Sequence, residues 1–308
     1  MNRIATPIVA VEAAPSRDGL QRRSVSVVMV VYMTGEALDQ SLACVLADPL
    51  VDELVVVDNG SAPAQAARLR ALSGQDARVT LVSGQGNVGF ARGANLGARR
   101  AAGDRIVFLN PDAFLQPGCV AALVGEIEGQ PVPSLVGGRI LNPDRTEQRG
   151  ARRGDITPIN ALLSMTGLAK AAALHRFEVH WETEALPEAA VEAPTISGAC
   201  FCMRREDFES VGGFDEQFFL HVEDVDLCWR VREAGGRVLF HPRAEVVHIG
   251  GTSQTSPLKV EFHKGVGLAR YFRKRAVATG RGRVVAWLMG PLVIAAAVAR
   301  PLVRRVRG

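Results

Sequence analysis

Three acidic side chains fall within four residues of this chain, at Glu223, Asp224 and Asp226, and His248 follows on a short apolar segment. A positioned carboxylate can take the proton of a hydroxyl nucleophile in the transition state, which is general-base chemistry. The alternative is that these acids only complement the dipole of a helix over residues 225–234. Three acids in four residues exceed what capping needs, so we predict a reactive site here.

Four apolar segments in the N-terminal half are separated by stretches with helical spacing. They cover residues 24–32, 52–61, 78–84 and 104–115 and are rich in Val, Ile and Leu, as buried strands of a parallel sheet are. A βαβαβαβ order with short connections predicts a doubly wound, mostly parallel α/β sheet with helices on both faces.

Polar residues follow each of these strands. Ligands of such sheets bind beyond the carboxyl ends of the strands, and this is where Thr34, Asp58, Asn87 and Asp112 fall. The alternative is that they are turn formers, since Asp and Asn favour turns. For Asn59 the two interpretations stay equally open.

A glycine-rich loop, GNVGFARGAN, opens a helix after the third strand. Backbone N–H groups at a helix N-terminus favour phosphate, and Arg92 would add a charge-assisted hydrogen bond. The loop lacks the Lys-Ser/Thr pair and the glycine spacing of the common phosphate-binding fingerprints. We therefore expect a phosphate-bearing ligand here without assigning one of those fingerprints.

Six motifs occur in a fixed order: VVVDNGS, GNVGFARGAN, FLNPD, SGACFCMRREDFESVGGFDEQFF, HVEDVDLCWRVREAGGR and VVHIGGTS. In this order the chain resembles a family 2 glycosyltransferase with the GT-A fold, and more narrowly its rhamnosyltransferase and galactofuranosyltransferase-like branch. The resemblance spans residues 24–253. It implies inverting transfer of a sugar, for which we expect rhamnose, from a dTDP- or UDP-sugar to a hydroxyl of a glycan or polyprenyl-linked acceptor in cell-envelope polysaccharide synthesis.

The resemblance also implies roles for individual residues. Asp224 matches the general base and Glu223 an acceptor-orienting partner, whereas Asp226 caps the helix or pairs with Arg230. The residues expected to bind the nucleotide-sugar are Tyr32, Thr34, Asp58, Asn59, Asn87, Gly89, Arg92, Asn95, Asn110, Asp112, Ser197 and Gly198.

A metal site is implied as well. Asn110-Pro111-Asp112 matches the position of the family's Asp-x-Asp metal motif, although Asn110 removes one charge. Mg²⁺ or Mn²⁺ takes oxygen ligands and can be held by one carboxylate plus substrate phosphates, so Asp112 is its expected anchor. His248 matches a histidine that joins the metal in some relatives; a structural histidine is the alternative.

The C-terminal tail differs in charge from the rest of the chain. The 308 residues carry a net charge of +4, yet eleven Lys or Arg and no acid follow Glu261, so the preceding body is acidic. We expect a disordered arm at 1–23, a catalytic domain at 24–255 and a basic helical tail at 256–308. The apolar stretch 284–299 is shorter than the ~20 residues of a transmembrane helix and contains a proline.

That stretch predicts an interfacial anchor on an anionic membrane surface. The alternatives are a helix packed on the domain or a dimer contact in a homo-oligomer. No nucleic-acid-reading motif accompanies the charge, so we expect no nucleic-acid partner. The chain begins without an apolar signal core, and its five cysteines suit buried thiols, with Cys200 and Cys202 on alternate strand positions. We expect a cytoplasmic protein, peripheral at the inner membrane face.

Two other functions remain open. One is a nucleotide-sugar-binding protein without catalysis, and the other is a membrane scaffold. A glycoside hydrolase is less favoured, because its paired carboxylates must flank the bond and it needs no nucleotide loop.

Overall fold

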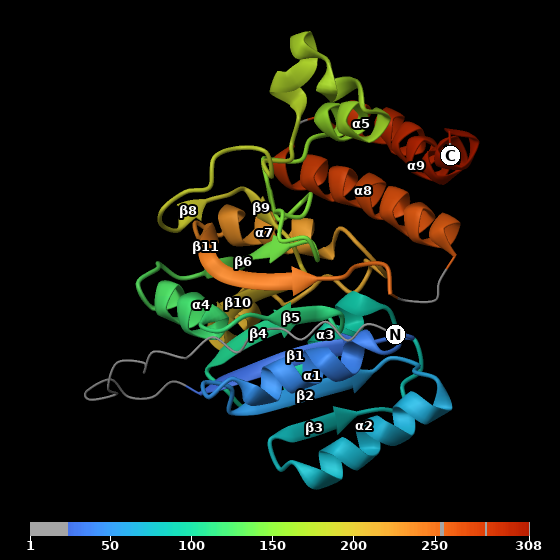
Figure 1. The fold of residues 1–308 in the computed structure, drawn as a ribbon. Coiled ribbons are helices and arrows are strands. Elements are labelled where there is room, and N and C mark those ends of the chain that lie inside the picture. Colours follow the sequence, from blue (N-terminus) through green and yellow to red (C-terminus); the bar gives the residue numbers. More distant parts are fainter. Residues whose placement is uncertain (1–23, 253–255, 281, 308) are drawn as a thin grey trace.

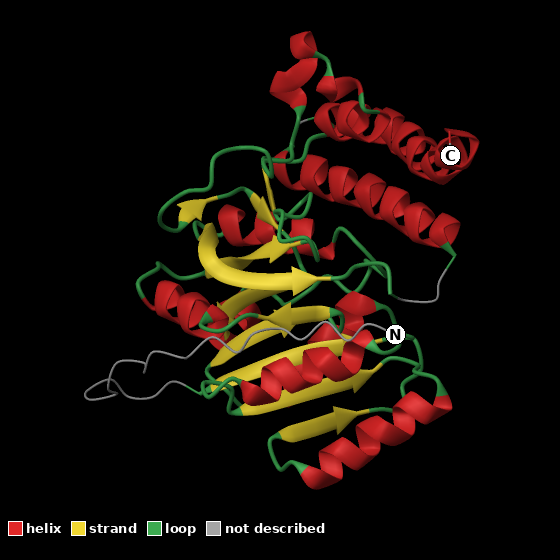
Figure 2. Cartoon of the chain, in the orientation of Figure 1, coloured by secondary structure: helices red, strands yellow, loops and turns green. Residues whose placement is uncertain are grey.

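A computed structural model of the chain describes residues 24–252, 256–280 and 282–307 (Figure 1). The predicted arm at 1–23 lies outside the described residues. The fold is a twisted central sheet with helices against both faces, and three further helices lie beyond one end of it (Figure 2).

The predicted parallel half of the sheet is confirmed. It consists of β3 (Val79–Val82), β2 (Glu53–Asp58), β1 (Val25–Val31) and β4 (Arg105–Leu109), in that order and all parallel. Every residue of β1 is buried, and successive residues face opposite cores. The unbroken Val-rich run arises because helices cover both faces of this strand.

The other half of the sheet is mixed. Its strands are β10 (Cys200–Arg204), β6 (Ser134–Leu141), β11 (Arg237–His248) and β5 (Ala113–Leu115), with β8 (Val191–Glu192) beside β11. β10 is antiparallel to both neighbours, while β6 and β11 are parallel. A separate ribbon pairs β7 (Arg152–Arg153) with β9 (Thr195–Ile196).

The helices divide between the two faces. On one face lie α1 (Ala37–Ala47), α2 (Pro63–Gln75) and α4 (Cys119–Glu128). On the other lie α3 (Phe90–Arg100), α6 (Arg205–Ser210) and α7 (Glu223–Glu233). The short α5 (Pro158–Thr166) belongs to the group beyond the sheet.

One strand prediction was wrong: residues 104–115 form two strands, not one. Pro111 has no N–H to continue the ladder, and the chain turns at Asn110-Pro111-Asp112. β5 then crosses to the far edge and pairs with β11. The Gly137-Gly138 pair lets β6 approach a neighbouring segment closely, since a Cβ on Gly137 would lie 2.7 Å from the Cβ of Ile196.

The tail forms two long helices, α8 (Pro257–Thr279) and α9 (Arg283–Arg307), which lie side by side (Figure 1). α8 buries Leu268, Tyr271 and Phe272 in a core shared with α7, and Ala286 and Val293 of α9 belong to the same core. None of the helices within the described residues has the length and apolarity to cross a membrane.

The seating of α3 on the sheet gives a testable prediction. A Cβ on Gly97 would lie 2.4 Å from Cγ1 of Val28, so Gly97→Ala should overpack this interface and cost about 1–3 kcal/mol of unfolding free energy. Gly125→Ala in α4 is the control, because a Cβ there meets nothing within 4 Å, and helix propensity should stabilise it by up to ~1 kcal/mol. Urea unfolding measures both; equal effects would contradict the packing argument.

Candidate active site

Asp112 and His248 meet at the end of the sheet. The β5–β11 register places His248 opposite Ala113, and His248 Nε2 lies 3.1 Å from Asp112 Oδ1. Thr252 donates to the other carboxylate oxygen at 2.9 Å. Burial alone would raise the pKa of Asp112, but the hydrogen bond and charge of His248, with Thr252, hold it below its ordinary value. Asp112 is therefore an ionised carboxylate.

This pair has the donor set of a partial site for a hard cation. Gln148 Oε1 lies 2.7 Å from His248 Nδ1 and orients the ring. A cation bound between His248 and Asp112 would take the place of the proton on Nε2, with Gln148 as the second-shell partner of the histidine. Asn110 Nδ2 lies 3.3 Å from the same Nε2. No cluster of three or more His, Cys, Asp or Glu suited to a metal occurs among the described residues. A cation here would take its remaining ligands from a substrate.

Asp224 lies in the first turn of α7 and is held by three hydrogen bonds. Its Oδ2 accepts hydrogen bonds from Gly198 N at 3.1 Å and from Arg153 Nη2 at 2.7 Å, and its Oδ1 accepts from Val225 N at 2.9 Å. This approach favours glycine at 198, because a Cβ there would lie 3.1 Å from the Cβ of Asp224 and would make a tight contact.

The segment 197–199 links this carboxylate to the metal-ligand pair. Gly198 bonds Asp224, and the carbonyl of the next residue, Ala199, accepts from Asn110 N at 2.9 Å. The structure therefore brings together two motifs that are more than a hundred residues apart in sequence. Ser197, which was also predicted to line the site, accepts a hydrogen bond from Ala199 N through its hydroxyl.

Glu223 is buried beside Asp224, with 7% of its surface exposed. Burial, together with the charge of Asp224, raises its pKa to about 8. Glu223 therefore keeps its proton at neutral pH, whereas Asp224 pairs with Arg153. Asp226 is fully buried and pairs with Arg230 at 2.7 Å, which was one of its two predicted roles, and also with Lys274.

On the side of the site where the nucleotide-sugar is expected to bind, Asp58, Asn59 and Asn87 hold the loops in place. Asp58 Oδ1 accepts from Ser61 N at 2.8 Å and Gly60 N at 3.2 Å. The side-chain amide of Asn59 donates to Asn87 and to the Gly89 carbonyl, and its oxygen accepts from Val88 N. Asn59 is thus committed to holding the glycine-rich loop, in line with the structural alternative.

Other predicted donor residues differ in placement. The Asn95 side chain donates to the Phe214 carbonyl at 2.8 Å and accepts from Phe214 N at 2.9 Å, so it fastens α3 to a loop. Its role as a ligand of the nucleotide-sugar stays a prediction. Arg92 is 58% exposed and lies 3.7 Å from Glu216.

The remaining predicted donor residues border the strand ends or the glycine-rich loop. Thr34 is buried, and its hydroxyl lacks a hydrogen-bond partner among the described residues. The Tyr32 ring packs against Gly60, where a Cβ would lie 3.3 Å from the ring edge. A Cβ on Gly89 would lie 2.6 Å from the Phe219 carbonyl oxygen, so the loop needs a glycine there.

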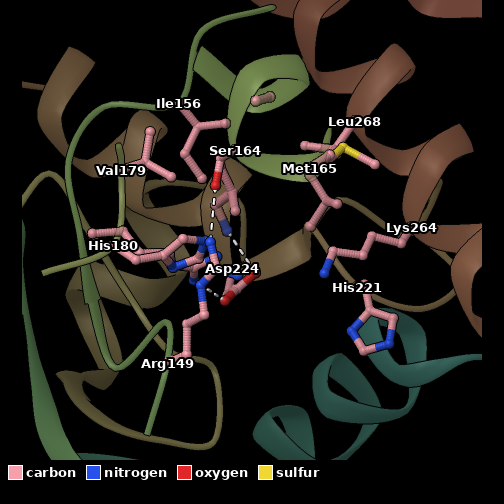
Figure 3. Close-up of a pocket in the computed structure, with 14 residues that line it drawn as sticks. Arg149, Ile156, Ser164, Met165, Val179, His180, His221, Asp224, Lys264 and Leu268 are labelled. Carbon is pink, nitrogen blue, oxygen red and sulfur yellow. Dashed lines mark hydrogen bonds and ion pairs between the residues drawn. The ribbon is translucent and has the colours of Figure 1, made fainter. Parts of the chain in front are cut away.

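A cavity of about 230 Å³ opens beside Asp224 (Figure 3). The basic residues that line it, Arg149, Arg153 and Lys264, were not predicted from the sequence, and neither was His180. Their signal in the sequence is the density of arginine in the loop before residue 155.

The fold is of the GT-A type. The mannosyltransferase PcManGT from Pyrobaculum calidifontis, solved with GDP-Man and Mn²⁺, shares the fold with a TM-score of 0.58 at 17% identity, covering 94% of this chain and 76% of that one. GalNAc-T7, solved with UDP, GalNAc and Mn²⁺, gives the same TM-score and identity over 81% of this chain and 47% of its own.

The chain belongs to glycosyl transferase family 2, whose model matches residues 26–212. A model of the N-terminal domain of galactosyltransferase matches residues 183–251. The N-acetylglucosaminyl-diphospho-decaprenol L-rhamnosyltransferase of Mycobacterium tuberculosis is 29% identical over 236 residues, which cover 72% of this chain and 75% of that protein. Rhamnosyltransferase WbbL of Escherichia coli is 33% identical over 67 residues, 20% of this chain and 25% of that one. The predicted family and fold are confirmed.

The protonation of Glu223 gives a pH-dependent prediction. Its pKa rises from an ordinary 4.5 to about 8 on folding, so the folded state keeps a proton that the unfolded chain loses, and this contribution to stability is lost as pH rises through about 8. Glu223→Gln cannot ionise. Its melting temperature relative to wild type should therefore increase between about pH 5 and pH 9.

Thermal unfolding over that pH range measures the difference. Glu209→Gln, an exposed position, is the matched control and should give a constant difference. A constant difference for Glu223→Gln too would show that Glu223 is already ionised in the folded protein.

Proposed function

We propose that the protein is an inverting, metal-dependent glycosyltransferase. It moves a sugar, with rhamnose as the first candidate, from a dTDP- or UDP-sugar to a hydroxyl of a glycan or polyprenyl-linked acceptor in cell-envelope polysaccharide synthesis. The proposal rests on one arrangement: the segment 197–199 bonds Asp224 through Gly198 and the Asn110 strand end through Ala199. The name of the mycobacterial relative supports the choice of sugar and acceptor class.

The chemistry assigned to this site is a single displacement. Asp224 takes the proton of the acceptor hydroxyl while that oxygen bonds to the anomeric carbon from the face opposite the leaving group. The bond between the anomeric carbon and the donor diphosphate breaks, and the nucleoside diphosphate leaves with the electron pair. Glu223 is protonated and can donate a hydrogen bond that orients the acceptor.

The donor half follows from the strand ends. Asp112 and His248 would hold Mg²⁺ or Mn²⁺, and when bound the ion supplies charge neutralisation at the donor diphosphate. Asp58 would accept hydrogen bonds from the base or ribose. A non-catalytic nucleotide-sugar-binding protein is the second candidate, and it gives no reason for a held carboxylate at Asp224.

A pair of variants separates the two halves of the site. Asp224→Asn should lower sugar transfer by about 100- to 10,000-fold, because a general base contributes that much, while leaving the Mn²⁺-dependent thermal shift by nucleoside diphosphate intact. Asp112→Asn should lose that shift, because its anchor for the ion is gone.

Transfer is assayed with nucleotide-sugars and membranes as acceptor, and the shift by differential scanning fluorimetry. Full turnover by Asp224→Asn would rule out its assignment as base. A shift by Asp112→Asn equal to that of wild type would remove the metal role of this residue.

We further propose that α9 seats the enzyme on an anionic membrane at the cytoplasmic face. Small residues of α9 face α8, where Gly265 approaches the Ile294 backbone. The outer side leaves large apolar groups exposed, here called the α9 apolar face: Val284, Trp287, Leu288 and Leu292. Arg273 stacks over the Trp287 ring, with 5.1 Å to its centroid. Apolar groups flanked by cations fit the headgroup region of an anionic bilayer.

Flotation with liposomes tests this seat. The double variant Trp287→Ser, Leu288→Ser should lose about tenfold or more in binding to phosphatidylglycerol vesicles, since two large apolar side chains no longer insert. Leu186→Ser, at another exposed apolar position, should bind as wild type does. If the double variant instead changes the oligomeric mass without lipid, the α9 apolar face is a protein contact.

A further inference from the structure

The cavity beside Asp224 is more cationic than a sugar hydroxyl requires. Of its lining side chains, Arg149, Arg153 and Lys264 are basic, and Asp224 is the single acid. In Figure 3, Arg149 and His180 approach from one side of Asp224 and Lys264 from the other. Neutral sugars are held by neutral and acidic hydrogen-bonding groups, so this charge points to an anionic part of the acceptor.

Two nitrogen atoms at the cavity are available to bond a ligand. Within the described residues, Arg153 Nε and His180 Nδ1 are buried without a hydrogen-bond partner. A buried polar group without a partner destabilises the fold unless a ligand or water satisfies it. Burial, and to a smaller extent the charges of Arg149 and Arg153, lower the pKa of His180 to about 3, so its imidazole is neutral.

The other part of the cavity is apolar. Ile156 and Met165 line it from the α5 side, and Val225 and Leu268 line it from α7 and α8. A water molecule occupies about 30 Å³ in the liquid, so a cavity of about 230 Å³ holds a much larger group. The ligand should therefore carry an anion next to an apolar portion.

We propose that this cavity is the subsite for a phosphate or diphosphate of the acceptor, with Arg149 and Arg153 as its ligands. The proposal rests on the proposed transferase function and assigns residues that determine acceptor specificity. Arginine suits this role because its planar donors bind phosphate oxygens in a bidentate manner.

The same assignment couples acceptor binding to the base. In the structure, Arg153 Nη2 pairs with Asp224 Oδ2 at 2.7 Å. A phosphate that draws the Arg153 guanidinium toward itself leaves Asp224 free to accept the proton of the hydroxyl. Arg153 is thus a positioning residue that holds the base until an anionic acceptor arrives.

Binding of simple probes to the full-length protein tests the subsite without turnover. Decyl diphosphate should bind, and decyl glucoside, which lacks the anion, should not. Excess chelator keeps the metal-dependent donor site from taking the diphosphate, and Asp112→Asn provides the same test by mutation. Isothermal titration should show that Arg149→Gln and Arg153→Gln each weaken decyl diphosphate by about tenfold or more.

Matched variants decide the outcome. Arg68→Gln, at an exposed ion pair far along the chain, should leave binding unchanged, and Arg153→Lys should restore part of what Arg153→Gln loses. Circular dichroism confirms folding. Inorganic diphosphate that binds alone with the same arginine dependence supports the anion site without a lipid.

Equal binding of decyl diphosphate and decyl glucoside, or equal affinity in wild type and both glutamine variants, overturns the proposal. Neither result would touch the transferase function, which the Asp224→Asn assay addresses. Conversely, if the wild-type protein shows no sugar transfer but binds diphosphate in an arginine-dependent manner, the transferase function fails and the anion subsite stands.

Discussion

The approach of Asp224 to the backbone of Gly198 is the constraint on which the rest of the site depends. Asp224 Oδ2 accepts from Gly198 N at 3.1 Å, and the space for a side chain at this position is already taken by Asp224. The next carbonyl bonds Asn110 N. Because one short, inextensible piece of backbone touches both motifs, the distance between base and strand end is set by covalent geometry.

The electrostatics of this place follow from burying two adjacent carboxyl groups. Two charges side by side in a buried site repel strongly, so one group keeps its proton. The structure assigns the proton to Glu223, which lacks a partner for Oε2 among the described residues, whereas Asp224 has Arg153 and two backbone N–H groups. Two acids that are adjacent in sequence thus differ in their protonation and bonding because the groups around them differ.

The sequence predicted those parts of the fold that local pattern decides. The strand at 24–32 was legible because its run is apolar on both faces, and Asp112 and Asp224 stood out by motif. The division of residues 104–115 into two strands could not be predicted from the local sequence. It depends on the pairing of β5 with β11, which lies more than a hundred residues away. The role of Arg153 was not predicted for the same reason, because its partner Asp224 lies 71 residues further along the chain. The motif around Asn95 likewise gives no sign that Phe214 takes both its amide atoms.

The first helix of the basic tail, α8, packs against the turn that precedes α7. His221 and Val222, just before α7, have φ of 65° and 75°, a conformation that a β-branched residue rarely adopts. α8 lies directly against this turn: a Cβ on Gly267 would be 3.0 Å from Val222 and 3.1 Å from the His221 carbonyl. Strained backbone persists only where packing over-determines it. α8 therefore helps hold the turn that precedes α7 and Asp224.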